Sequence, residues 1–172
     1  MFHVELLNKT LNLKGFFLFL VFLFSVSCST PRYAVDVSDY ILVENGMKIL
    51  GKEKGLTAFI FQNNPEKITF NQFLTQKYNL GTYINIEYWT VIDGMRFKII
   101  LYDNADLNKY FDTTDYIASN VVADDAVVGS KVKFLAISVI NEVNEDCLAD
   151  GSLFQNIVVK YLKDLKDEYN RN

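Results

Sequence analysis

The chain contains very few residues of the types that build the commonest catalytic centres. Its 172 residues include one histidine, His3, and two cysteines, Cys28 and Cys147. His3 belongs to an N-terminal segment that we expect to be removed, so neither a Ser–His–Asp or Cys–His site nor a histidine-rich zinc site can be built. The glycines are spread singly, and no glycine-rich phosphate-binding loop is present. We therefore expect a protein that is not an enzyme and that binds no cofactor and no metal.

The charge balance also excludes a class of partners. The chain has 17 Lys and Arg against 21 Asp and Glu, a formal net charge of -4. Nucleic-acid-binding proteins need a basic surface, so we expect no nucleic-acid partner. Half of the residues are apolar, which is enough for the core of one ordinary domain.

The N-terminal segment has the layout of a secretory signal peptide. Lys9 and Lys14 precede an unbroken apolar run over residues 16–24, and small residues follow. The run has nine residues, whereas a membrane-spanning helix needs about 20. The alternative is an anchor helix extended backwards through Leu11 and Leu13, which Asn12 and Lys14 interrupt. We predict a signal peptide over residues 1–27.

The end of this segment resembles the lipobox of bacterial lipoproteins. Val26 and Ser27 are small residues before Cys28, and Ser25 replaces the usual Leu, as in the relaxed boxes of the Bacteroidetes group. The resemblance implies that Cys28 is acylated, becomes the first residue and holds the protein to the membrane. Residues 28–39 would then form a lipidated tether. No acidic run follows Cys28, which favours an outer-membrane lipoprotein that faces the periplasm. The alternatives are the inner membrane, or ordinary secretion that leaves Cys28 a free thiol.

The remaining residues, 40–172, are predicted to form a single α+β domain. Apolar runs separated by turn signals predict a mostly antiparallel sheet of about five strands, with two main helices packed on it. Capping boxes at Thr69–Gln72 and Ser152–Gln155 predict where the two main helices begin. The expected strands cover 47–50, 56–62, 82–92, 95–102 and 131–143, and residues 40–43 are a short apolar run. The expected main helices cover 70–78 and the C-terminal segment, and a short helix is expected over 105–111.

The segment around Asp93-Gly94 is the best-specified unit of the sequence. This dipeptide favours a two-residue hairpin turn, which places Thr90 opposite Phe97 and Tyr88 opposite Ile99 on the core face. The other face then carries a candidate interaction surface. Its members are Trp89, Val91, Arg96, Lys98, Ile100 and Tyr102. The alternatives are that a helix or loop covers this face, or that Lys98 simply stacks over Trp89.

Two acidic segments and Cys147 are the other candidate sites. Residues 103–108 and 142–150 are rich in side-chain oxygens but lack the pattern of a calcium-binding loop, so we interpret both as solvated loops. Nothing basic lies near Cys147 in the sequence to lower its pKa, which indicates a structural thiol.

The function predicted from the sequence is that of a lipid-anchored, periplasm-facing envelope lipoprotein. We expect it to act as a non-catalytic accessory or protein-interaction module, with another envelope protein as its partner. One alternative is a lipoprotein that binds a small ligand between its sheet and its helices. The other is a hydrolase that uses paired carboxylates.

Overall fold

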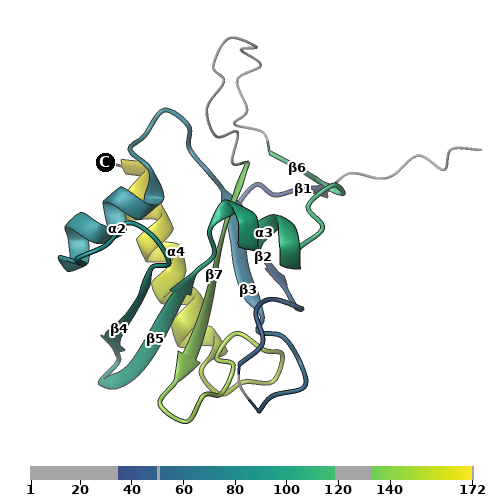
Figure 1. Ribbon diagram of the computed structural model, residues 1–172, viewed down its shortest axis with the longest axis vertical. Coiled ribbons are helices and arrows are strands. Elements are labelled where there is room, and N and C mark those ends of the chain that lie inside the picture. Colours follow the sequence, from purple (N-terminus) through teal and green to yellow (C-terminus); the bar gives the residue numbers. More distant parts are fainter. Residues whose placement is uncertain (1–34, 50, 119–132, 172) are drawn as a thin grey trace, which may run out of the picture. The chain divides into compact units, whose positions relative to one another are not determined.

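The computed structural model describes residues 35–49, 51–118 and 133–171. Their elements are, in chain order, β1 (Val35–Asp36), β2 (Ile41–Val43), β3 (Ala58–Gln62), α2 (Phe70–Tyr78), β4 (Glu87–Ile92), β5 (Met95–Leu101), α3 (Asn104–Tyr110), β6 (Tyr116–Ile117), β7 (Phe134–Asn141) and α4 (Gln155–Arg171). Five strands form one sheet in the order β2-β3-β7-β5-β4, and β1 pairs with β6 in parallel (Figure 1). Every neighbouring pair in the five-stranded sheet is antiparallel, which confirms the predicted α+β class.

Strands β3 and β7 lie inside the sheet, as their apolar sequences predict. All residues of both strands are buried, because both faces of the sheet are covered at this position. Ile60 lies opposite Ala136, and Ile137 lies between Phe59 and Leu101 in the paired register. β7 is shorter than expected, and the first two residues of the predicted strand, 131–132, lie outside the described residues.

Helices α2 and α4 cover one face of the sheet and form the main core with it. The ring of Tyr169 on α4 contacts the Phe70 ring edge-on at a centroid distance of 5.0 Å, and Phe61 meets Phe70 at 5.4 Å. These aromatic side chains fill the space between the sheet and the two helices. On α4, the side chains of Val158, Leu162, Leu165 and Tyr169 are buried.

The two main helices begin differently, although the sequence suggests the same cap for both. At α2 the box is formed: the Thr69 hydroxyl accepts from the Gln72 N–H, and the Gln72 side chain accepts from the Thr69 N–H. At α4 the expected box is absent, because the helix begins only at Gln155. The Gln155 side chain donates instead to the carbonyl oxygen of Leu148, at 2.9 Å.

The described residues cover the opposite face of the sheet only in part. Helix α3 packs Leu107 against it, and the loop over residues 44–57 lies across its central strands. This loop stands where the sequence predicts a strand over residues 47–50, because β3 pairs with β2 instead. The Gly46 N–H donates to the Leu56 carbonyl at 2.9 Å, which folds the loop back on itself. A Cβ on Gly46 would lie 2.7 Å from that carbonyl oxygen and would also collide with the Tyr102 hydroxyl.

Candidate functional site

The β4–β5 hairpin has the register that its turn predicts. Asp93 and Gly94 have φ values of 48° and 79°, which are the positive values that a type I′ turn requires. Trp89 lies opposite Lys98, and Val91 lies opposite Arg96. Strand β4 begins at Glu87 and not at residue 82, because the chain turns at Asn85 with a φ of 50°.

Four of the six residues predicted as an interaction surface are at least partly accessible. Trp89 is 45% exposed and Val91 63%, Arg96 is exposed and Lys98 is half-buried. We call these four residues, together with Glu87, the Trp89 surface. They lie on β4 and on the neighbouring strand β5, beyond the area that α3 and the 44–57 loop cover.

The remaining two predicted residues, Ile100 and Tyr102, are not part of an accessible surface. Ile100 is 5% exposed and packs against Leu56 and Ile140, while Tyr102 is 3% exposed. Register places both on the expected sheet face, so the error lies in what covers them. The 44–57 loop lies over this part of β5. The residue pattern of β4 and β5 cannot predict that a loop over 40 residues earlier in the chain covers Ile100 and Tyr102.

A chain of hydrogen bonds holds Tyr102 beneath that loop. The Met47 N–H donates to the Tyr102 hydroxyl at 3.0 Å, and this hydroxyl lies 2.9 Å from the Ser138 hydroxyl. The Ser138 hydroxyl donates to the Thr57 carbonyl at 2.7 Å. Tyr102 therefore donates to Ser138, and both hydroxyls are satisfied in the interior. Burial raises the pKa of Tyr102, although its bonds to Ser138 and Met47 oppose the shift.

The charged side chains of the Trp89 surface form pairs that leave it with little net charge. The guanidinium carbon of Arg96 lies 5.2 Å from the Trp89 ring centroid, and its Nη1 lies 3.3 Å from Glu142 Oε1. The residue stacked on Trp89 is therefore Arg96 and not Lys98, which forms an ion pair with Glu87 instead. The Arg96–Glu142 pair is solvent-exposed and the Lys98–Glu87 pair is partly exposed, so both contribute little to stability.

The acidic segment 142–150 has structural roles in its described hydrogen bonds. Asp146 accepts from the backbone N–H groups of Thr57 and Leu148, at 2.7 and 3.0 Å, and so anchors two loops. The Glu145 carboxylate accepts from the Asn141 side chain at 2.8 Å. In the 103–108 segment, Asp103 caps α3 by accepting from the Asp106 N–H. In the part of the chain that the structure describes, no group of three or more His, Cys, Asp or Glu side chains is arranged to hold a metal ion.

Cys147 has the character of a structural thiol. It is fully buried, and its Sγ donates to the Glu145 carbonyl at 3.4 Å. Burial, with the nearby charges of Asp146 and Glu145, raises the pKa of this thiol to about 12. A thiol with such a pKa is protonated at neutral pH, which is the opposite of an activated nucleophile.

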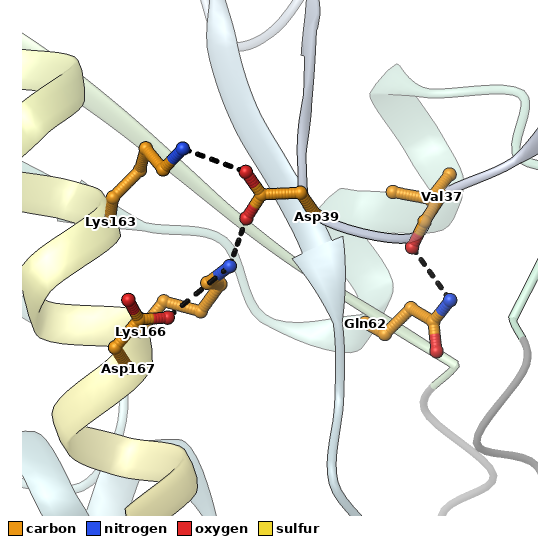
Figure 2. A network of polar contacts seen from close by, with 6 residues as sticks. All are labelled: Val37, Asp39, Gln62, Lys163, Lys166 and Asp167. Carbon is orange, nitrogen blue, oxygen red and sulfur yellow. Dashed lines mark hydrogen bonds and ion pairs between the residues drawn. The ribbon is translucent and has the colours of Figure 1, made fainter.

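The fold begins earlier than the predicted boundary at residue 40. Residues 35–39 were expected to be tether, yet Val37 is 1% exposed and its carbonyl accepts from the Gln62 side chain at 2.6 Å. The Asp39 carboxylate accepts from Lys163, at 2.8 Å, and from Lys166, both on α4 (Figure 2). Sequence reasoning missed this cluster, since 127 positions separate Asp39 from Lys166. Residues 1–27 and Cys28 lie outside the described residues.

The two lysines change the acidity of Asp39. Partial burial raises the pKa of this carboxyl, but the hydrogen bonds and positive charges of Lys163 and Lys166 outweigh that effect and hold it below its usual value. The cluster therefore ties the N-terminal end of the fold to α4 with a charged side chain.

Comparisons with family models, curated proteins and solved structures give no match to this chain. Among the helices in the described ranges, none combines the length and the apolar character needed to cross a membrane. An open hollow of about 420 Å³ lies along residues 108–114 and is formed by that one segment. It is not the cavity between sheet and helices that a small-ligand carrier would use, since aromatic side chains occupy that space.

Proposed function

We propose that the protein is a lipid-anchored lipoprotein of a bacterial envelope, facing the periplasm, that acts as a non-catalytic protein-interaction module. The proposed interaction rests on the accessibility of the Trp89 surface. It keeps a large aromatic side chain and an arginine accessible on a rigid hairpin, and these residue types are enriched at binding hot spots. An apolar group of this kind, held in water at a fixed place, supports docking of another envelope protein.

The anchoring part rests on the sequence before the fold. The charged start, the apolar run over 16–24 and Val26-Ser27-Cys28 support cleavage and acylation at Cys28. One acyl chain of myristoyl size binds a membrane only marginally, so stable anchoring needs two or three chains on Cys28. Since the fold starts by Val35, the intervening residues 29–34 span at most about 20 Å when extended, which keeps the domain near the membrane.

Metabolic labelling with a palmitate analogue tests the anchor. The parent protein should be labelled, and Cys28→Ala should abolish the label. Cys147→Ala is the matched control and should leave labelling unchanged, because this thiol is buried and protonated. A label that persists in Cys28→Ala would overturn the anchor.

Capture of envelope proteins by the anchored chain tests the docking surface. Trp89→Ala should reduce the recovery of a cross-linked envelope partner, while the protein stays folded. Leu153→Ala is the matched control, since Leu153 is 93% exposed but lies in the loop before α4. Equal recovery with both variants would remove Trp89 from the docking surface.

A further inference from the structure

Among the described residues, strand β4 forms an edge of the sheet that no other strand pairs with. In a two-residue hairpin the residues next to the turn are a hydrogen-bonded pair, and every second pair follows. Ile92 and Met95 are that pair. The bond from the Leu101 N–H to the Ile86 carbonyl shows that these two residues are also a hydrogen-bonded pair, as the alternation requires. The N–H and C=O groups of Glu87, Trp89 and Val91 therefore point away from β5. No strand in the described part of the chain pairs with this edge.

This edge carries few of the features that normally prevent pairing with another chain. Proteins blunt open edges with short strands, prolines, bulges or lysines. β4 has six residues in unbroken register, with neither proline nor lysine among them. The opposite edge of the sheet, β2, has only three residues. The two edges thus differ in the way expected if β4 has a pairing function.

We propose that the open edge of β4 pairs antiparallel with the same edge of a second copy of this chain, about a two-fold axis at Trp89. In this register Trp89 lies opposite the Trp89 of the second copy, and Glu87 lies opposite its Val91. All three outward N–H groups and all three outward C=O groups of each copy then find partners, whereas a register shifted by two residues leaves some unpaired. The inference rests on the proposed function, because it names a partner for the Trp89 surface.

The charges of the surface favour a second copy in this orientation. Antiparallel pairing places Glu87 of one copy beside Val91 of the other, and the neighbour of Val91 on β5 is Arg96. The two Glu87 carboxylates lie at opposite ends of the paired strands, where they do not repel each other. Parallel pairing would bring these like charges together, which destabilises a strand pair.

Pairing of one strand per copy is expected to be weak in dilute solution. Stable interfaces bury about 800 Å² per partner, and a six-residue strand supplies only part of that area. Two copies anchored in one membrane share a much smaller volume, which raises their effective concentration. The paired form should therefore be most populated on a membrane.

Cysteine cross-linking between two variants tests the pairing and its register. Glu87→Cys and Val91→Cys are prepared separately in the lipidated protein and placed on vesicles of phosphatidylethanolamine and phosphatidylglycerol. Opposed residues of a hydrogen-bonded pair have Cα atoms about 5.5 Å apart, which suits a disulfide. Two Val91→Cys positions lie about 14 Å apart along the paired strands, too far for a disulfide. Mild oxidation should therefore give covalent dimers in the mixture and at least tenfold fewer with either variant alone.

A charge variant separates specific pairing from random collision. Trp89→Lys, added to both cysteine variants, places two positive charges opposite each other at the axis and should lower cross-linking at least tenfold. Leu153→Lys adds the same charge at an exposed position away from β4 and should leave the yield unchanged. Equal yields in the mixture and in the single variants, or no dimer in any of them, would overturn the pairing.

The outcome is distinguishable from a failure of the proposed function. Palmitate-labelled protein that gives no cross-link overturns the pairing and leaves the anchor in place. Register-specific cross-links in concentrated, unlabelled protein overturn the anchor and support the pairing.

Discussion

Truncating Ile100 should destabilise the fold more than truncating Trp89, although tryptophan is the larger side chain. Both residues lie on the same face of the sheet, on neighbouring strands. Ile100 is 5% exposed and packs against Leu56 and Ile140, whereas Trp89 is 45% exposed. The comparison therefore measures where the covered part of this face ends.

The two magnitudes follow from burial. Replacing a buried isoleucine by alanine costs about 2–5 kcal/mol, because apolar contacts are lost and a cavity remains. Truncating a fully buried tryptophan would cost about 3–5 kcal/mol. Nearly half of Trp89 is already in water, and its removal leaves a space that solvent can fill and not a closed cavity, so the cost is smaller. Its contact with Arg96 adds about 0.5–1 kcal/mol at an exposed site. We expect about 1–2 kcal/mol for Trp89→Ala and at least 1 kcal/mol more for Ile100→Ala.

Urea unfolding followed by far-ultraviolet circular dichroism measures both variants with one signal. Fluorescence is unsuitable, because Trp89 is the single tryptophan of the chain. Val91→Ala serves as the control and should lie close to the parent, since Val91 is 63% exposed. A loss for Trp89→Ala equal to or above that for Ile100→Ala would refute the reasoning and show that the Trp89 surface is covered.

Four further substitutions test other parts of the described structure. Among the described residues, the buried Tyr88 hydroxyl has no hydrogen-bond partner, so Tyr88→Phe should leave the free energy of unfolding unchanged or raise it by up to about 1 kcal/mol. Tyr161→Phe removes the 2.6 Å bond to the Tyr78 hydroxyl and should lower the free energy of unfolding by about 1 kcal/mol in the same urea assay. Tyr102→Phe leaves the half-buried Met47 N–H without its partner and should cost about 1–2 kcal/mol; a cost near zero would show that water replaces the hydroxyl. Because the folded-state pKa of Asp39 is lowered, its ion pairs stabilise the fold above the unfolded-state pKa of about 4 and lose that effect as pH falls through the lowered value. Asp39→Asn should thus be less stable than the parent at pH 7 by about 0.5 kcal/mol, since the Asp39 side chain is 43% exposed. A difference that persists in acid would contradict the charge argument.

The elements that the sequence predicted well depend on neighbouring residues. The α2 bounds follow from Thr69 and Gln72, which cap the helix within one turn, and from Asn79, whose positive φ ends it. The hairpin register follows from Asp93-Gly94 alone, because a two-residue turn fixes every pair that follows. In these cases the interaction that decides the structure lies within a few positions of the residues that it organises.

The errors concern contacts between distant parts of the chain. Tyr102 is buried because the Met47 N–H, 55 positions away, donates to it. Asp39 belongs to the fold and not to the tether because Lys166, 127 positions away, binds it. Neither contact has a local signal: alternation assigns Tyr102 to a face but does not say whether a loop crosses that face. The anchor at Cys28 and the docking function stay predictions.

The two faces of β4 differ in a way that suits docking. On the helix side Tyr88 stacks against the Tyr78 ring of α2 at 4.5 Å, so the strand is held by the aromatic core as far as the sheet edge. On the other side the covering loop extends to Ile100 on β5 and leaves Trp89 accessible. β4 is thus held in place by packing on its helix side, while its outer face and its edge stay accessible to a partner. A partner that binds such a strand loses little free energy to ordering it, because the backbone is already in the bound conformation. This is the physical reason to place docking at β4 and not at the acidic segments 103–108 and 142–150, where Asp103 and Asp146 already accept hydrogen bonds from backbone N–H groups.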